Sequence, residues 1–357
     1  MQRKIPDSQR PRAQDLGIDA GLLPRGIHNT ITDVPGVRVG HVSLVKGDGG
    51  PLRIGQGPVQ CAGVTIILPH GGNTFKQKVT AAAHVINGFG KSVGLPQVME
   101  LGVIESPIAL TNTLNVWSVA DALADYLSQQ NPGVFSFNPV VGECNDSFLN
   151  DILGRHVKSE HVEQAIQSAS SPSVSEGNTG AGVGMRGFGW KGGIGTASRL
   201  CRTASAASTV GVLVLTNTGD PRELRIGGVD VGHHILPPGY SYEAPGSIMI
   251  VVATDARIDS RQLGRMARRA ALGLGRVGAI ASHGSGDFVI AFSNAAQPPD
   301  LGDDDLTSLF RGVVEATEEA IVNSLLRAET LTGRDGNTCH AIPIDRLKEL
   351  LSIKASA

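Results

Sequence analysis

The chain has 357 residues and a formal net charge of −2, from 31 basic and 33 acidic side chains. This balance argues against a nucleic-acid partner and against attachment to an anionic membrane surface. No apolar run approaches the roughly 18 residues of a membrane span, and the polar N-terminus lacks a signal peptide's apolar stretch. Four scattered cysteines without a CxxC pair fit a reduced, cytoplasmic setting and argue against a zinc site.

The first half of the chain is predicted to mix strands and helices. Residues 1–26 form an irregular arm, and residues 27–42 alternate apolar and polar side chains around a Pro-Gly turn, which predicts a hairpin. Residues 61–68 (CAGVTIIL) predict a buried strand. A helix over 115–130 has an asparagine at its N-cap and one apolar stripe. Residues 140–146 (VVGECND) predict an apolar strand that ends in polar side chains.

The second half opens with a glycine-rich run at 180–195. Because this run lacks the order GxxxxGK[ST] and no helix pattern follows it directly, close strand packing is favoured over a phosphate-binding loop. Strands are then expected at 208–216, 248–253 and 288–292. Helices are expected at 261–277, from the acidic run at 303–305 to Arg327, and at 345–351.

These elements come in blocks, two strands and then a helix, and do not alternate strictly. That order favours an α+β layered sandwich over a doubly wound parallel sheet. The chain carries no long low-complexity linker, so a single domain over residues 1–357 is expected.

The most informative stretch is the junction at Ser247. A segment rich in proline and glycine ends at Gly246, and Ser247 is the last polar residue before the apolar run 248–253. Cleavage of the Gly246–Ser247 bond would give Ser247 a free α-amine beside its own hydroxyl. An α-amine has a reference pKa of about 7.7–8.0, so it could act as a base near neutral pH. The alternative reading is an ordinary turn before a strand.

Other polar residues follow or precede predicted strands. Ser285 and Asp287 are two residues apart, so in an extended segment they point to one face and could relay a proton; a simple Ser-Asp turn is the alternative. Glu143 is either a surface charge or a site for a substrate ammonium group. Cys144 is a candidate nucleophile, but no histidine lies close to it in sequence, so a small apolar packing role is favoured. Asn217 ends the strand at 208–216.

Together these segments resemble the L-aminopeptidase/D-esterase (DmpA) family, which includes the β-aminopeptidases. The resemblance spans almost the entire chain, in order. It is carried by ITDVPGVRVGH (31–41), GVTIILP (63–69), ESPIALTNT (105–113), VVGECND (140–146), the glycine run, GVLVLTN (211–217), ELRIGG (223–228), PGSIMIVVATDA (245–256), ARRAALGL (267–274) and GSGDFVIAF (284–292).

The resemblance implies a four-layer αββα sandwich, similar to that of N-terminal nucleophile hydrolases. It also implies a chain that cuts itself between Gly246 and Ser247, into residues 1–246 and 247–357, which stay together. Ser247 would be both cleavage site and nucleophile. Asn217 would donate to the oxyanion, Glu143 would hold the substrate ammonium, and Ser285 with Asp287 would help to activate Ser247.

The resemblance further implies homo-oligomers, usually tetramers, that remove N-terminal residues from small peptides, amides or esters with a free amine. No metal or organic cofactor is called for. Two alternatives remain: an acyl transferase similar to the self-cleaving ornithine acetyltransferases, or an uncleaved, non-catalytic relative. The sequence leaves open the choice between α- and β-amino substrates, between L and D forms, and between the α-amine and the Ser285–Asp287 pair as the main base.

Two positions depart from the family pattern. Some members have Glu where this chain has Asp287. The aspartate side chain is shorter, so its reach as a proton relay differs from that of glutamate. Some also have a tyrosine in the block after Glu143, where this chain has Cys144, Asn145 and Phe148. A tyrosine hydroxyl therefore has no counterpart in that block.

Overall fold

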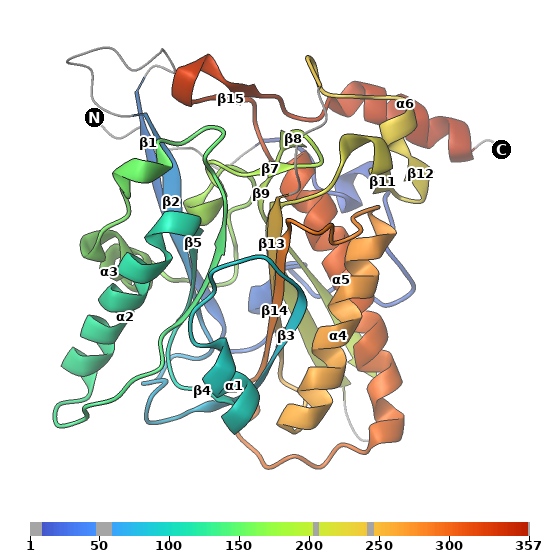
Figure 1. The fold of residues 1–357 in the computed structure, drawn as a ribbon. Helices are drawn as coiled ribbons and strands as arrows, with labels where there is room; N and C mark the ends of the chain where they lie inside the picture. The colour runs from blue at the N-terminus through green and yellow to red at the C-terminus, as the bar shows by residue number, and fades with distance from the viewer. Residues whose placement is uncertain (1–8, 48–58, 203–206, 241–245, 356–357) are drawn as a thin grey trace.

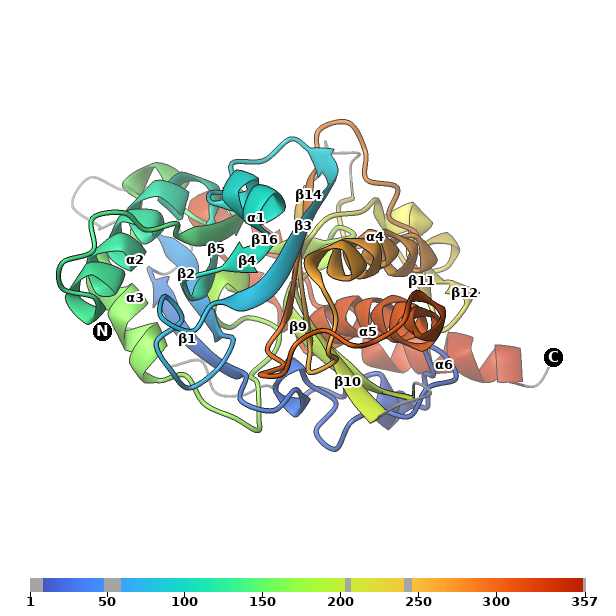
Figure 2. The same cartoon turned by 90° about the horizontal axis from the view of Figure 1, so that it is seen from below.

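The protein is described from a computed structural model, which covers residues 9–47, 59–202, 207–240 and 246–355. Two β-sheets lie face to face, and each has helices on its outer side (Figure 1). The view from below shows the four layers in order, with α2 and α3 on one flank and α4 and α5 on the other (Figure 2). The predicted α+β sandwich with αββα layers is therefore confirmed.

The smaller sheet has the strand order β1-β2-β5-β6. Its β5–β6 pair is parallel, whereas the other two pairs are antiparallel. The strands are β1 (Arg38–Lys46), β2 (Gln60–Leu68), β5 (Ile108–Asn112) and β6 (Val140–Cys144).

The larger sheet has the order β4-β3-β14-β13-β10-β9. Its β13–β14 pair is parallel, and α4 forms the crossover between these two strands. The strands are β3 (Val79–Gly88), β4 (Val103–Ile104), β9 (Gly193–Arg202), β10 (Ala207–Asn217), β13 (Ser247–Thr254) and β14 (Gly286–Ser293). Short two-stranded pairs are β7 (Arg186–Gly187) with β8 (Trp190–Lys191), β11 (Arg225–Ile226) with β12 (Val229–Asp230), and β15 (Leu331–Thr332) with β16 (Thr338–Cys339).

Helices α2 and α3 pack on the outer face of the smaller sheet, and α4 and α5 pack on that of the larger sheet. The helices are α1 (Leu95–Leu101), α2 (Val116–Gln130), α3 (Ser159–Gln167), α4 (Ser260–Arg276), α5 (Leu306–Leu326) and α6 (Ile344–Ala355). Close approach of α5 to β9 needs a missing side chain, because a Cβ at Gly195 would lie 2.0 Å from the Ala320 carbonyl oxygen. The predicted packing role of the glycine run is thus confirmed at this position.

The core lies in three apolar layers. One lies between the two sheets, one between the larger sheet and α4 and α5, and one between the smaller sheet and α2 and α3. All eight residues of β13 are buried, because this strand is central in the larger sheet and covered on both faces. A strand covered on both faces has a continuous run of apolar residues, so β13 can be recognised directly in the sequence.

Some local expectations were wrong. The predicted hairpin over 27–42 is instead a short 3-10 helix, Ile31–Asp33, followed by β1. The Asp33 carboxylate accepts from the backbone N–H groups of His28 and Thr30, which turns the chain before it can extend into a strand. Asn115 lies at the start of α2, but its side chain does not cap the helix; the Asn112 side chain caps the preceding turn. Strands β3 and β5 and helix α1 were not anticipated.

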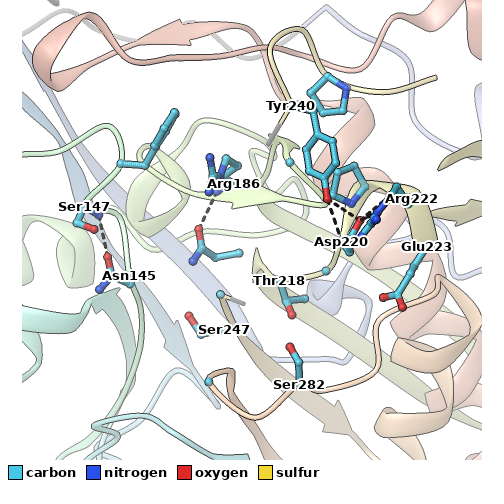
Figure 3. A pocket seen from close by; sticks show the side chains of 18 of the residues that line it. Asn145, Ser147, Arg186, Thr218, Asp220, Arg222, Glu223, Tyr240, Ser247 and Ser282 are labelled. Carbon is cyan, nitrogen blue, oxygen red and sulfur yellow. Dashed lines mark hydrogen bonds and ion pairs between the residues drawn. The ribbon is translucent and has the colours of Figure 1, made fainter. Parts of the chain in front are cut away.

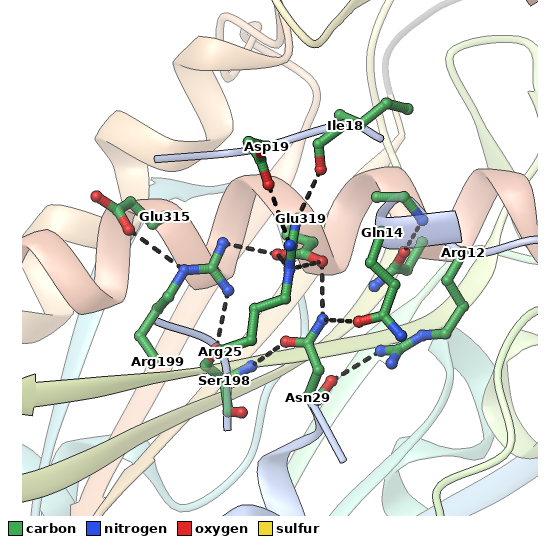
Figure 4. Close-up of polar contacts among 12 residues, drawn as sticks. Arg12, Gln14, Ile18, Asp19, Arg25, Asn29, Ser198, Arg199, Glu315 and Glu319 are labelled. Atoms are coloured by element: carbon green, nitrogen blue, oxygen red, sulfur yellow. Dashed lines mark hydrogen bonds and ion pairs between the residues drawn. The ribbon is translucent and has the colours of Figure 1, made fainter. Parts of the chain in front are cut away.

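The described part of the N-terminal arm, residues 9–26, packs against the body of the protein through buried charges (Figure 4). Arg25 Nε donates to Glu319 Oε1 at 3.0 Å. Fully buried Arg199 lies 2.6 Å from Glu319 and 3.2 Å from Glu315. Because each buried carboxylate has a guanidinium partner, this cluster joins the arm to β9 and α5 without leaving unpaired charge.

Candidate active site

Strand register brings the predicted site residues together at one end of β13. Ser247 is the first residue of this strand and lies between the ends of two neighbours. It pairs with Asn217, the last residue of antiparallel β10, and with Gly286, the first residue of parallel β14. Three segments far apart in sequence therefore meet at the Ser247 hydroxyl. This hydroxyl is buried and has no hydrogen-bond partner among the described residues.

Two donor groups lie near Gly246, one of them at its carbonyl oxygen. This oxygen accepts a hydrogen bond from Gly286 N–H at 3.3 Å. The Asn217 side-chain amide is oriented by Arg186, whose backbone N–H donates to Asn217 Oδ1 at 2.8 Å. That bond turns the Nδ2 end of the amide toward Gly246. A Cβ on residue 246 would lie 1.4 Å from the Asn217 carbonyl oxygen, so this close approach requires glycine.

Ser285 and Asp287 form the predicted side-by-side pair. Ser285 Oγ donates to Asp287 Oδ1 at 2.7 Å, and Ser285 Oγ lies 3.4 Å from Thr218 Oγ1. Both members of the pair are fully buried. Burial raises the pKa of Asp287 to about 6, while the bonds from Ser285 and from the Ile248 backbone oppose that rise. The second oxygen, Oδ2, is buried and has no partner among the residues described, so this carboxylate has spare capacity to accept a proton.

Glu143 is a buried residue of the site and not a surface charge. It is the last residue but one of β6 in the smaller sheet, yet it borders the same cavity as Ser247. A Cβ on Gly142 would lie 2.3 Å from Met249 Cε, so the two sheets approach closely here because residue 142 has no side chain. Glu143 accepts from Lys91 N–H at 2.9 Å and from the Thr113 hydroxyl. Its two oxygens are thereby fixed beside the cavity.

Cys144 occupies the packing role that was predicted for it. It is fully buried in the core between the sheets, and Sγ lies 3.4 Å from the Leu215 carbonyl oxygen. Burial raises the pKa of its thiol well above the usual value. A thiol held neutral in this way is a poor nucleophile.

Ser247, Asn217 and Glu143 border a cavity of about 650 Å³ (Figure 3). Ser285, Asp287 and Cys144 are not among the residues that line it. Ser247 and Thr218 lie at its centre, Arg186 above them, and Tyr240, Asp220 and Arg222 to one side. The Tyr240 hydroxyl lies 3.1 Å from each oxygen of Asp220, which also pairs with Arg222 at 2.7 Å. The hydrogen bonds from Arg222 hold the pKa of Asp220 below its usual value.

Sequence reasoning missed several groups of the cavity wall, among them Thr113, Arg186, Thr218 and Tyr240. Two of them could have been found from the sequence, because they adjoin segments that carry the family resemblance. Thr113 ends the block ESPIALTNT, and Thr218 directly follows GVLVLTN. Arg186 lies in the glycine run, which was interpreted by its glycines alone. The arrangement as a whole places a hydroxyl without a partner among the described residues near a carbonyl group, N–H donors and a separate carboxylate. These are the groups that acyl transfer requires.

Comparison with known proteins decides the family. Residues 29–339 match Peptidase family S58. The chain belongs to this family. Beta-peptidyl aminopeptidase BapA of Sphingosinicella microcystinivorans is 43% identical over 371 residues, covering 96% of this chain and 92% of the relative.

Solved structures agree with this assignment to S58. The PH0078 protein of Pyrococcus horikoshii OT3 superposes with a TM-score of 0.91 at 45% identity, covering 97% of this chain and 99% of that one. The L-aminopeptidase D-Ala-esterase/amidase of Ochrobactrum anthropi, a prototype of the serine aminopeptidases with a variant Ntn hydrolase fold, gives a TM-score of 0.87 at 34% identity, covering 97% and 99%.

These comparisons confirm the predicted family resemblance and the predicted class of activity: the protein is an aminopeptidase. None of the relatives described above is named as an acyl transferase, which was the alternative. Across the part of the chain that the structure describes, no helix has both the length and the apolar character to cross a bilayer.

Proposed function

We propose that this S58 aminopeptidase cuts itself between Gly246 and Ser247 and then uses Ser247 as an N-terminal nucleophile. The observation that supports this most directly is the setting of the Gly246–Ser247 bond. Its carbonyl oxygen already accepts from Gly286 N–H, the Asn217 amide nitrogen lies beside residue 246, and the Ser247 hydroxyl has no competing hydrogen bond among the described residues. Donors placed at the oxygen that becomes negative stabilise a tetrahedral intermediate.

The proposed cutting reaction is an N→O acyl shift followed by hydrolysis. Ser247 Oγ forms a bond to the Gly246 carbonyl carbon, its proton passes to the departing nitrogen, and the C–N bond breaks to leave an ester. The acyl shift thereby leaves Ser247 with a free α-amine. Water then hydrolyses the ester, which gives a carboxylate on Gly246 and restores the Ser247 hydroxyl. No α-amine exists before the acyl shift, so the buried Ser285–Asp287 pair is the base we assign to that step.

In turnover, the same hydroxyl attacks a substrate carbonyl while Glu143 holds the substrate's free ammonium group. The substrates we propose are small peptides, amides or esters with a free N-terminal amine. Similarity to a protein named beta-peptidyl aminopeptidase supports β-amino N-terminal residues among them. Mass spectrometry of the purified protein, followed by assays on α- and β-aminoacyl p-nitroanilides, tests this function; a full-length chain without turnover contradicts it.

The two fragments are proposed to stay associated because the cut lies inside a sheet. Strands β13 and β14 come from residues 247–357, and they are central in the larger sheet between β3 and β10. Separation would expose both faces and both edges of these buried strands. We also propose a cytoplasmic homo-oligomer, a tetramer by family resemblance.

Chain cutting is expected to slow as the pH falls through about 6. The folded-state pKa of Asp287 is raised to about 6 from 3.8, so the carboxylate is largely ionised at pH 7 and about nine-tenths protonated at pH 5. A protonated Asp287 cannot accept the proton from Ser285. Full-length chain refolded at pH 5 and at pH 7, sampled over time by gel electrophoresis, measures this difference.

The Asp287→Asn variant serves as the control, since it should cut slowly at both values. Its kcat after maturation also identifies the base for turnover. A low kcat would indicate that Asp287 is also the base during turnover, whereas a near-normal kcat would indicate that the α-amine of Ser247 is that base. Wild-type cutting rates at both pH values in Asp287→Asn would contradict the proposed base.

Glu143→Gln is expected to lower kcat/KM for free-amine substrates about 10- to 100-fold, because a hydrogen bond to a charged partner contributes about 1.5–3 kcal/mol. N-acetylated substrates should be poor for the wild type as well. The matched control is Glu105→Gln, another buried carboxylate, which pairs with Lys78 and is not among the residues that line the cavity. Rapid cleavage of N-acetylated peptides would remove Glu143 from this role.

A further inference from the structure

Lys191 is a buried cation that the proposed chemistry does not use directly. It lies on β8, at the end of the glycine run, with 0% exposure. Its ammonium group donates to the carbonyl oxygens of Gly182, Met185 and Gly192 at 3.0, 2.8 and 2.7 Å. The thiols of Cys61 and Cys339 also face it, and burial lowers its pKa to about 8, so it remains mostly charged at pH 7. Burying an ammonium group is unfavourable in free energy unless its donors are satisfied, and here all three N–H donors bind carbonyl groups of one loop.

One of these carbonyls belongs to the peptide unit that orients Asn217. The Met185 carbonyl accepts from Lys191 Nζ and also from Gly192 N–H at 3.1 Å. The N–H of the same peptide unit, on Arg186, donates to Asn217 Oδ1 at 2.8 Å. In a planar trans peptide the C=O and N–H point in opposite directions. Holding the carbonyl toward Lys191 therefore holds the N–H toward Asn217.

The direction of that N–H decides which end of the Asn217 amide faces the reaction centre. With Oδ1 bound to Arg186 N–H, the donor end Nδ2 faces Gly246, where a Cβ on that residue would lie 3.0 Å from Nδ2. If the peptide turned over, its carbonyl would face Asn217 and attract Nδ2 instead. The acceptor Oδ1 would then face the oxyanion, where it repels developing negative charge.

We propose that Lys191 is a positioning residue for the oxyanion donor: by fixing the Met185–Arg186 peptide, it keeps Asn217 Nδ2 turned toward the reacting carbonyl. This inference rests on the proposed function, because it assigns Asn217 to the oxyanion. It differs from a purely structural role for Lys191, which would affect stability and leave the Asn217 amide as it is.

A double-mutant cycle tests this coupling. Lys191→Met should lower kcat about tenfold or more with KM within about twofold, because the lost donor acts on the transition state. In an Asn217→Ala background the same change should have almost no further effect on kcat, since the group through which Lys191 acts is absent. Equal losses in both backgrounds would overturn the proposal.

Arg199→Met provides the matched control. Arg199 is also a fully buried cation, but its partners Glu315 and Glu319 lie on α5 (Figure 4). None of these three residues lines the cavity. This variant should lose thermal stability yet retain kcat below its unfolding temperature. If Lys191→Met does not fold, Lys191→Gln keeps amide donors for the loop, and it should show a smaller loss of kcat that again disappears without Asn217.

A crystal structure of the folded Lys191 variant separates this inference from the proposed function. Wild-type protein that neither cuts itself nor turns over aminoacyl substrates would contradict the function. The orientation of the 185–186 peptide is readable even then, and the group that it presents to Asn217, N–H or C=O, assigns which end of the amide faces residue 246. A turned peptide with Oδ1 toward residue 246 supports the positioning role, and an unchanged peptide and amide overturn it.

Discussion

Ser247→Ala protein is expected to remain a single full-length polypeptide with no measurable aminopeptidase activity. Wild-type protein should instead yield fragments 1–246 and 247–357 that co-purify. The reason is that both events need the same atom, Ser247 Oγ, and alanine supplies no replacement nucleophile. Intact mass measurement gives the fragment boundaries directly, and N-terminal sequencing of the smaller fragment should begin at Ser247.

The fold of this variant should be preserved. The Ser247 hydroxyl is buried without a hydrogen-bond partner among the described residues, so its removal breaks no bond and leaves the sheet pairing of β13 intact. Thr254→Val is a suitable control, because it removes a buried hydroxyl from the opposite end of the same strand. That variant should still be processed. Cleavage of Ser247→Ala at the same bond, or wild-type protein that stays full length, would contradict the mechanism.

Asn217→Ala is expected to lower kcat about 10²–10³-fold, the usual cost of removing one side-chain donor to an oxyanion. KM should change little, because the donor binds the tetrahedral state more strongly than the substrate. The change also removes the acceptor for Arg186 N–H, so the cost in stability should be measured separately by thermal unfolding.

Thr216→Val separates the role of Asn217 from local packing. Thr216 precedes Asn217 on β10, is fully buried, and its hydroxyl has no partner among the described residues. A valine there should leave kcat nearly unchanged. A similar kcat in Asn217→Ala and wild type would assign the oxyanion to other donors, of which Gly286 N–H is already at the Gly246 carbonyl.

Features of the chain that depend on local pattern were predictable from sequence. The buried run 248–253 identifies β13 because a central strand with both faces covered needs continuous apolar side chains. Helix α4 follows from its amphipathic spacing. The Ser285–Asp287 contact follows from a two-residue spacing in an extended segment, since alternate side chains share one face. The family resemblance then supplied roles that these patterns alone do not specify.

The assembly of the site was decided by tertiary structure. No local pattern places Glu143 beside Ser247, because the two residues lie in different sheets and meet only where Gly142 lets Met249 approach. The turn over 31–33 replaced a predicted hairpin because one carboxylate could bind two backbone donors. The spacing of residues within a strand or helix can be read from the sequence, whereas contacts between two sheets depend on how the layers pack. That packing brings Glu143 and Ser247 to one cavity.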